Sequence, residues 1–263
     1  MLRREAISVL LAAALNDRLS RFFDQPQGTA VLMDVKTRRL IAMHGGGTIA
    51  PPGSTIKPFV LATLLRNRKL TAAEPYVCPQ RLTIAGRSFS CSHPSLGVPV
   101  TARTAIAYSC NCFVAHVAQR FAPGELAMGL ERASLTGSIS RARGPEAIQL
   151  QALGESGISL TAAELAMGYR SLALGTEPPI LEGMEDAVEY GTAQLARVEG
   201  MKVAGKTGSI RTGDGARIAW FAGFAPSRSP EVVVTVMLQG RSGGSDAAPI
   251  AGKILAAYRA GKL

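Results

Sequence analysis

The sequence predicts an α+β fold, an α/β/α sandwich in which one antiparallel sheet is built from both ends of the chain. Strand patterns stand near the beginning, at 29–35 and 40–43, with a turn between them. Further strand patterns stand near the end, at 201–209, 217–225 and 231–238. The apolar spacing between these two groups is mostly helical. We therefore expect the strands to share one sheet and the helices between them to form a mainly helical lobe.

The helical patterns can be placed one by one. The first helix is expected to begin near Ser54 and to continue through the apolar run 59–65. Two more are expected at 101–108 and 113–118. A longer one covers 161–173, and it starts with a threonine three residues before a glutamate, which is the capping-box pattern. The stretch 247–258 predicts a closing helix.

The chain has 263 residues, which is long enough to bury a sizeable core. No repeat or linker divides it, so we expect one domain over 16–263. Its sheet lobe would comprise about 16–50 and 185–263, and its helical lobe about 51–184. Residues 1–15 have two interpretations, an export signal or a helix that packs on the domain, because a basic start precedes a short apolar stretch. That stretch is too short to span a bilayer.

The formal net charge of +10 favours acidic surroundings. Lys and Arg are scattered, however, and the densest group, 66–69, lies at the end of a predicted helix, where cations favour the helix dipole. Aromatic residues make up only 5% of the chain, and no zinc-finger spacing or RNA-binding motif is present. Nucleic acid is therefore not an expected partner, whereas an anionic polymer fits the charge.

The four cysteines allow two interpretations. Cys78 and Cys91 bracket a segment rich in turn residues, and the pattern slightly favours a disulfide between them in an oxidising compartment. Alternatively, all four cysteines are reduced and buried. Cys110 and Cys112 are too close in sequence for a good mutual bridge. No metal or cofactor is expected, because ligand spacing to the cysteines is missing for His44, His93 and His116.

A serine and a lysine follow the segment Pro51-Pro52-Gly53 and begin the first predicted helix. Ser54 and Lys57 are three residues apart, so they lie on one face of that helix. A neutral lysine can take the proton of a serine hydroxyl and so make a nucleophile without histidine. On its own, the same pattern also fits a capped helix with a solvent-exposed lysine.

Two further motifs decide between these interpretations. Ser109-Cys110-Asn111 lies between two predicted helices, and Lys206-Thr207-Gly208 lies on a predicted strand. Together with Ser54-x-x-Lys57, and in this order, they resemble the transpeptidase domain of penicillin-binding proteins, in the serine acyltransferase/β-lactamase superfamily. The resemblance covers about 15–260, and three more segments share it, namely 157–161, 191–193 and 220–226.

The resemblance implies roles for the catalytic residues. Ser54 would attack an amide carbonyl, and Lys57 would act as its general base. Ser109 would pass a proton to the leaving amine, and Asn111 would hold Lys57 and the substrate amide. Lys206 would supply positive charge beside Ser109.

It also implies how substrate is held. Thr207 would hydrogen-bond the substrate carboxylate, and Gly208 would let the substrate backbone approach an edge strand. The oxyanion hole would be formed by the backbone N–H groups of Ser54 and Ser209. The middle motif departs from the S-D-N form, because Cys110 replaces the aspartate. We expect its side chain to point away from the cleft.

The substrate class that the resemblance implies is the D-Ala-D-Ala stem peptide of peptidoglycan, and β-lactams would acylate Ser54 as mimics of it. Acyl transfer to an amine makes a transpeptidase, and transfer to water makes a carboxypeptidase. Such a domain works without a cofactor and outside the cytoplasm, in the periplasm or cell envelope. A protein of cell-wall synthesis is a further expected partner.

Three alternatives remain. A β-lactamase suits the length of the chain, but Glu146, the candidate for activating the deacylating water, lacks the neighbouring E-x-x-L-N pattern, so we interpret it as a surface glutamate. A class D β-lactamase, which is one form of this first alternative, would need an apolar pocket around a carboxylated lysine, and its middle motif differs from Ser109-Cys110-Asn111. A β-lactam or peptidoglycan sensor would keep the motifs, although no spanning or signalling segment accompanies them. A catalytically dead scaffold would have no reason to keep them.

Overall fold

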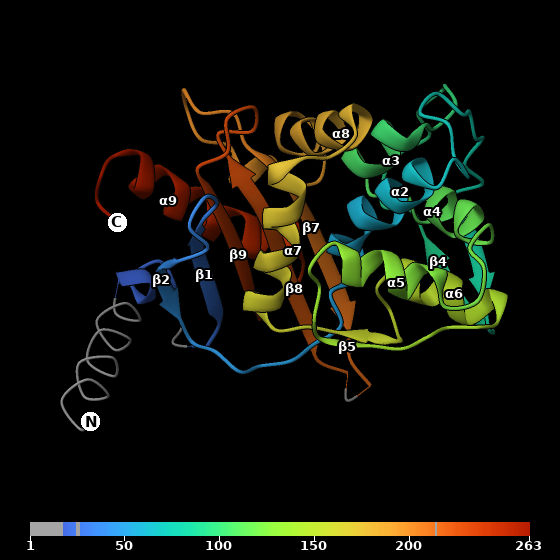
Figure 1. The fold of residues 1–263 in the computed structure, drawn as a ribbon, viewed down its shortest axis with the longest axis horizontal. Helices are drawn as coiled ribbons and strands as arrows, with labels where there is room; N and C mark the ends of the chain where they lie inside the picture. Colours follow the sequence, from blue (N-terminus) through green and yellow to red (C-terminus); the bar gives the residue numbers. More distant parts are fainter. Residues whose placement is uncertain (1–17, 25–26, 214) are drawn as a thin grey trace.

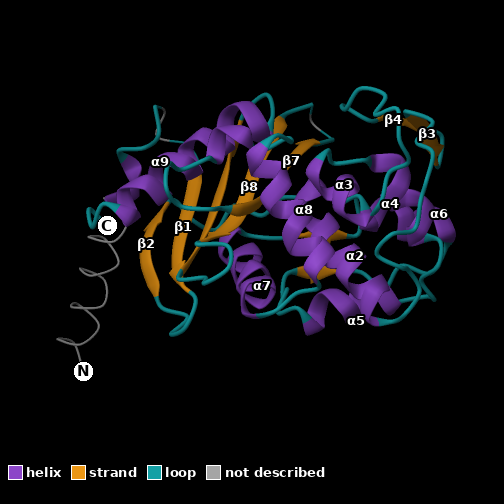
Figure 2. Ribbon diagram, turned by 90° about the horizontal axis from the view of Figure 1, so that it is seen from above, coloured by secondary structure: helices purple, strands orange, loops and turns teal. Residues whose placement is uncertain are grey.

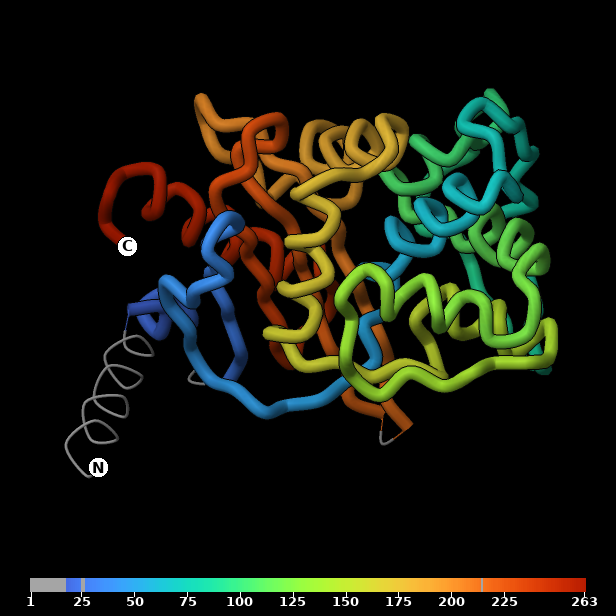
Figure 3. The backbone as a smooth tube through the Cα atoms, viewed as in Figure 1, coloured from blue at the N-terminus to red at the C-terminus, as the bar shows by residue number. Residues whose placement is uncertain are grey.

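The computed structural model describes residues 18–24, 27–213 and 215–263, and its central feature is a five-stranded antiparallel sheet (Figure 1). Its strands are β1 (Thr29–Asp34), β2 (Leu40–His44), β7 (Ala204–Arg211), β8 (Arg217–Ala225) and β9 (Val232–Gln239). Their order is β2-β1-β9-β8-β7, so the two ends of the chain meet where β1 pairs with β9, and Val31 lies opposite Thr235. The backbone tube shows this meeting of early and late segments (Figure 3). β7 occupies one edge of the sheet.

The helices follow from the sequence patterns. They are α2 (Lys57–Arg66), α3 (Ala102–Ala107), α4 (Asn111–Ala118), α5 (Glu125–Arg132), α6 (Pro145–Ala152), α7 (Ala162–Leu174), α8 (Pro178–Glu189) and α9 (Ala248–Arg259). Short 3-10 turns stand at η1 (Gly53–Ile56) and η2 (Gln194–Ala196), and one π-helical turn, η3 (Gly243–Ala247), leads into α9. Two small two-stranded sheets complete the described fold. One is the hairpin of β3 (Arg81–Ile84) and β4 (Arg87–Ser90), and the other pairs β5 (Ser138–Ile139) with β6 (Ile158–Ser159).

Helices cover both faces of the sheet, which makes three layers (Figure 2). α7 packs on β1, β8 and β9 from one side, and α9 packs on β8 and β9 from the other. Alternate residues of β8 show why both faces are apolar, since side chains along a strand point to opposite faces. Trp220 and Phe224 belong to the core on the α7 side, whereas Ala219 and Phe221 belong to the core on the α9 side.

The predicted fold class is confirmed, and the strand patterns fall on the five sheet strands with shifts of a few residues. The predicted helices correspond to α2, α3, α4, α7 and α9. The division into lobes stays a prediction, and α7, which falls inside the predicted helical lobe, packs on the sheet. The two interpretations of 1–15 concern residues outside those described. Among the described residues, no helix is long and apolar enough to cross a membrane.

The hairpin of β3 and β4 is missing from the sequence prediction, which assigned mostly helical periodicity to this region. Leu82, Ile84 and Phe89 alternate with polar residues, and the turn between the strands is Ala85-Gly86, both at positive φ (49° and 73°). Two central residues at positive φ are the geometry of a tight hairpin turn. Alanine at the first position hid the signal, because Asn-Gly or Asp-Gly is the pattern that predicts such turns.

The capping box at the start of α7 gives a prediction about stability. Thr161 Oγ1 accepts a hydrogen bond from Glu164 N (3.2 Å), and Glu164 Oε2 accepts one from Thr161 N (2.8 Å). Thr161→Ala should destabilise the fold by about 1 kcal/mol, because it leaves a helix N–H without its acceptor. We expect the midpoint of thermal unfolding to fall by about 2–4 °C. Thr48→Ala, in an exposed loop, is the control, and an equal shift in both variants would contradict the role of the cap.

Candidate active site

Ser54 lies in the 3-10 turn η1, immediately before α2, and is half-buried. The turn is held from outside the helix, because Gly53 N donates to Gly154 O (3.1 Å). Gly53 has φ of +54°, a left-handed conformation that glycine adopts without strain. Pro58 then occupies the first turn of α2, where a missing N–H costs nothing. The chain therefore enters α2 in one fixed direction, with Ser54 at its start.

Lys57 is fully buried, and its ammonium group points to the S-C-N loop. Nζ donates to the carbonyl oxygen of Ser109 (2.8 Å) and to Asn111 Oδ1 (2.6 Å), and it lies 3.3 Å from Ser109 Oγ. Burial lowers the pKa of Lys57 to about 8, because a low-dielectric surrounding disfavours the charged form. Among the described residues, Ser54 Oγ has no hydrogen bond, so the expected contact between the serine and the lysine is not made in this state.

The S-C-N loop joins α3 to α4, and its backbone is unusual. Ser109 has φ of +57°, which is rare for a residue with a side chain and marks local strain. Cys110 caps α4, and its Sγ accepts from Phe113 N (3.4 Å). Asn111 is the first residue of α4, and its Nδ2 donates to Ser90 O (2.9 Å). Asn111 thus connects Lys57 on one side to the end of β4 on the other.

The K-T-G motif lies on the edge strand β7. Lys206 is fully buried, and its Nζ donates to Thr207 O (3.1 Å). Burial, together with the nearby charge of Lys57, lowers the pKa of Lys206 well below its usual value. A Cβ on Gly208 would lie 2.6 Å from Pro52 O, so glycine here lets β7 approach the turn that carries Ser54.

These elements surround one cavity of about 390 Å³. Five of the predicted site residues line it, namely Ser54, Ser109, Asn111, Thr207 and Ser209. Lys57 and Lys206 are buried in the surrounding protein, and Gly208 packs against the serine turn. The backbone nitrogen of Ser209 would lie 3.4 Å from a Cβ on Gly53, so the two halves of the expected oxyanion hole are neighbours. The arrangement brings two serine hydroxyls, an asparagine amide and a threonine hydroxyl to one cavity, beside two buried lysines.

Comparison with protein families agrees with this geometry. The model of the penicillin binding protein transpeptidase domain matches residues 28–176 and 176–256. The chain belongs to this family.

Two Bacillus subtilis proteins are similar in sequence to this chain. Stage V sporulation protein D is 38% identical over 91 residues, which are 30% of this chain and 14% of that protein. Penicillin-binding protein 1A/1B is 27% identical over 282 residues, covering 80% of this chain and 29% of that protein. The chain thus spans less than a third of the length of either relative.

Solved structures share the fold at low sequence identity. A D,D-transpeptidase domain of a peptidoglycan glycosyltransferase from Eggerthella lenta matches with TM-score 0.77 and 20% identity, over 94% of this chain and 81% of that one. Pseudomonas aeruginosa PBP2 in complex with WCK 5153 gives TM-score 0.80 and 18% identity, over 93% and 76%. A peptidoglycan glycosyltransferase from Burkholderia ambifaria gives 0.79 and 20%, over 96% and 94%.

Several residues of the transpeptidase cavity were not assigned from the sequence. Thr192 Oγ1 and Thr207 Oγ1 are hydrogen-bonded (2.9 Å), and Gly243 N donates to Ser209 Oγ (3.0 Å). The lining that the sequence did not assign is completed by Ser90, Ser92, Ser242 and Gly244. Thr192 could have been found, since it stands in the G-T-A segment that shares the family resemblance. The others lie at the end of β4, in the loop after it and around η3, where the sequence has no motif.

Glu146 lies away from the cavity. It is exposed, and its carboxylate accepts a hydrogen bond from Ala85 N (3.0 Å) at the turn between β3 and β4. Its interpretation as a surface glutamate is confirmed. Within the described part of the chain, no carboxylate side chain lines the cavity.

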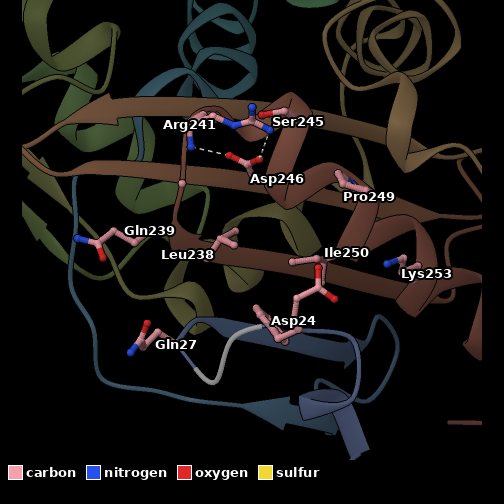
Figure 4. A pocket seen from close by; sticks show the side chains of 12 residues that line it. Asp24, Gln27, Leu238, Gln239, Arg241, Ser245, Asp246, Pro249, Ile250 and Lys253 are labelled. Atoms are coloured by element: carbon pink, nitrogen blue, oxygen red, sulfur yellow. Dashed lines mark hydrogen bonds and ion pairs between the residues drawn. The ribbon is translucent and has the colours of Figure 1, made fainter.

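A second pocket, of about 400 Å³, lies beside the sheet at the end of β9 and the start of α9 (Figure 4). Arg241 and Asp246 are paired there, and Leu238 and Ile250 contribute apolar surface. Ser245 and Lys253 both line this pocket, but no hydrogen bond joins them in the described part of the chain, and none of the three motifs belongs to the described lining. We therefore assign the chemistry to the smaller cavity around Ser54.

The disulfide that the sequence favours between Cys78 and Cys91 is not formed. All four cysteines are free, and the two Sγ atoms are 3.6 Å apart, whereas a disulfide bond is about 2.05 Å long. Cys110 Sγ lies 3.5 Å from Cys78 Sγ, so the thiols form one cluster rather than one bridge. Cys110 points away from the cavity, as expected. The sequence argument that no histidine is placed to ligate with the cysteines missed His93, which joins this cluster.

The contact between the serine turn and the loop at Gly154 gives a prediction. Gly154 has φ of +71°, and a Cβ there would lie 2.2 Å from Gly53 O. Gly154→Ala should displace the turn and slow acylation of Ser54 by a fluorescent penicillin by about 10- to 100-fold, because misplacing a reacting group by about 1 Å has effects of that size. Gly144→Ala is the matched control, since its added Cβ meets open space. Equal acylation rates in both variants would show that the turn tolerates the displacement.

Proposed function

We propose that this chain is a serine DD-transpeptidase or DD-carboxypeptidase domain that acts on D-Ala-D-Ala stem peptides of peptidoglycan through an acyl-enzyme at Ser54. Family membership supports the class of reaction. The observation that carries the assignment of residues is the buried Lys57, hydrogen-bonded to Ser109 and Asn111 beside the cavity that Ser54 lines. All three motifs contribute to that one arrangement.

Acylation would proceed with Lys57 neutral. Ser54 Oγ attacks the carbonyl carbon of the penultimate residue and gives its proton to Lys57 Nζ. The C–N bond to the last residue then breaks, and the proton passes through Ser109 Oγ, 3.3 Å from Lys57 Nζ, to the departing amine. The result is an ester on Ser54 and a free amino acid. For this step the Lys57 side chain would turn from the S-C-N loop toward Ser54.

The substrate would lie along the edge of β7. An edge strand presents unpaired backbone groups, which can bind an extended peptide as an additional strand. Thr207 and Ser209 face the cavity from this strand, so Thr207 Oγ1 can bind the terminal carboxylate while the N–H groups of Ser54 and Ser209 hold the carbonyl oxygen. Lys206, buried close to Lys57, adds positive potential on this side.

The acyl group would leave to an amine or to water. A class A β-lactamase uses a glutamate for the attack of water, and no carboxylate lines the described cavity. This observation favours a long-lived adduct with β-lactams over rapid hydrolysis. We further propose that the domain works outside the cytoplasm, where peptidoglycan is cross-linked, and with a partner from cell-wall synthesis.

The first test detects a covalent adduct. Wild-type protein incubated with a fluorescent penicillin should gain the mass of one penicillin, and the adduct should persist for hours. Ser54→Ala should gain none, and Ser229→Ala, in the exposed turn between β8 and β9, should behave as wild type. An adduct on Ser54→Ala would overturn the assignment of the nucleophile, and loss of the wild-type adduct within seconds would favour a β-lactamase. An assay with a D-Ala-D-Ala peptide, with and without an acceptor amine, separates transpeptidase from carboxypeptidase.

The second test is the pH dependence of acylation. Because the pKa of Lys57 is lowered to about 8 and only the neutral amine accepts a proton, the acylation rate should rise as pH increases through 8. Well below 8 it should fall about tenfold per pH unit, with the fraction of neutral amine. Stopped-flow fluorescence between pH 6 and 9.5 measures this profile, and a flat profile would contradict Lys57 as the base.

Asn111→Asp sharpens that test. A carboxylate 2.6 Å from Lys57 Nζ stabilises the charged ammonium, so the midpoint of the profile should move up by about 1–3 pH units. Gln239→Glu adds the same charge at the end of β9, outside the cavity, and should leave the midpoint unchanged. If both variants keep the wild-type midpoint, the titrating group is not Lys57.

A further inference from the structure

A cluster of metal-ligating side chains lies beside the S-C-N loop, outside the cavity. Cys78 stands in the loop before β3, Cys91 directly follows β4, and Cys110 caps α4. His93 follows two residues after Cys91. The ligand atoms of these four residues all lie within 4.8 Å of one another. We propose that the four side chains bind one zinc ion, which holds the loop of Ser109 and Asn111 in place.

The distances between the sulfur atoms fit tetrahedral coordination. Cys78 and Cys91 are 3.6 Å apart, Cys78 and Cys110 are 3.5 Å apart, and Cys91 and Cys110 are 3.7 Å apart. Zinc–thiolate bonds of about 2.3 Å in a tetrahedron place two sulfur atoms about 3.8 Å apart. The three thiols therefore already form one face of the required tetrahedron. A single disulfide would join only two of the three sulfur atoms and would not explain why all three lie at similar distances from one another.

His93 supplies the fourth ligand. Its Nε2 lies 3.8 Å from Cys78 Sγ, and the side chain is buried. Its Nδ1 lies 2.8 Å from Pro94 O, a carbonyl that can only accept, so Nδ1 carries the proton and Nε2 presents a lone pair toward the thiols. A histidine that binds a metal through one ring nitrogen commonly donates the N–H of its other ring nitrogen to a backbone carbonyl.

Cys112 is the other candidate for the fourth position. Its Sγ lies 3.5 Å from Cys91 Sγ and it is buried. It follows Cys110 by two residues on the same helix, and it is not part of the set of four mutually close ligand atoms. We assign it to the apolar packing next to the site.

The site is enclosed but reachable. Cys110 is fully buried, whereas Cys78 and His93 line a separate cavity of about 280 Å³ with apolar neighbours such as Val98. An ion can enter from that side. Binding one Zn²⁺ displaces three thiol protons to solvent and leaves a complex of three thiolates, one neutral imidazole and the ion, with a net charge of −1. No electron is transferred.

Zinc would act on the catalytic loop through its ligands. Cys110 lies between Ser109 and Asn111, and Cys91 follows Ser90, whose carbonyl accepts from Asn111 Nδ2 (2.9 Å). One ion bound to Cys91 and Cys110 therefore fixes both ends of that hydrogen bond. Ser109, with φ of +57°, needs such support, because a strained backbone persists only where its surroundings enforce it. These cysteines are positioning residues, and this part of the inference rests on the proposed function.

The direct test measures zinc in this chain, purified with zinc and a phosphine reductant. Mass spectrometry of the metal should give about one zinc ion per chain. Cys78→Ser and His93→Ala should bind zinc at least about 10-fold more weakly, because each removes a ligand. Cys112→Ala and His116→Ala are the matched controls and should keep the wild-type zinc content. His116 is exposed and stacks on Tyr76, outside the cluster.

The wild-type protein tests the inference without any variant. Removal of zinc with a chelator should lower the thermal midpoint and slow acylation by fluorescent penicillin, and added zinc should restore both. Absence of zinc, with four free thiols or with two of them oxidised to a disulfide, would overturn the site. Zinc that is lost in Cys112→Ala but kept in His93→Ala would overturn the assignment of His93.

Ser54→Ala separates this inference from the proposed function. It should keep the full zinc content while losing acylation, because Ser54 does not belong to the cluster. If wild-type protein binds zinc but no penicillin, the proposed function fails and the metal site stands. If zinc removal leaves the acylation rate unchanged, the ion does not position the loop.

Discussion

The burial of Lys57 is the constraint on which the active site depends. An ammonium group away from water is costly unless its protons meet acceptors. Ser109 O and Asn111 Oδ1 supply two at 2.8 and 2.6 Å, and both belong to one short loop between α3 and α4. The loop must therefore keep its shape for Lys57 to stay buried, and the strained φ of Ser109 is part of that shape. The same burial lowers the pKa of Lys57, which suits the proposed role of its amine as a base.

Close backbone packing fixes the turn that carries Ser54. The turn of Ser54 is confined between the loop at Gly154 and the strand at Gly208, and a Cβ at either glycine would overlap a backbone oxygen of the turn. Glycine at 208 was expected to make room for substrate. In the structure it also leaves space for Pro52 O. Glycine at 208 therefore helps to place the turn that carries Ser54 as well.

Local patterns in the sequence predict most of the fold and most of the residues around the cavity. The strand patterns located the sheet, and the three motifs located Ser54, Ser109, Asn111 and Thr207 around one cavity. What they could not give depends on contacts between distant segments. The β3–β4 hairpin brings Cys78 and Cys91 to Cys110, and no spacing rule describes a cluster assembled by a hairpin with an Ala-Gly turn. Ser242 and Gly244 reach the cavity from the start of η3, where the sequence has no motif.

The middle residue of the S-C-N motif joins the cysteine cluster to the active site. Its neighbours Ser109 and Asn111 face the cavity, so its own side chain turns to the other side of the loop, where it caps α4. An aspartate would satisfy the helix terminus equally well, since a negative group is favoured there. Cysteine adds a soft ligand next to Cys78 and Cys91, which an aspartate would not match in a thiolate-rich zinc site. The cysteine at position 110 is therefore better explained by the cluster with Cys78 and Cys91 than by the chemistry of the cavity.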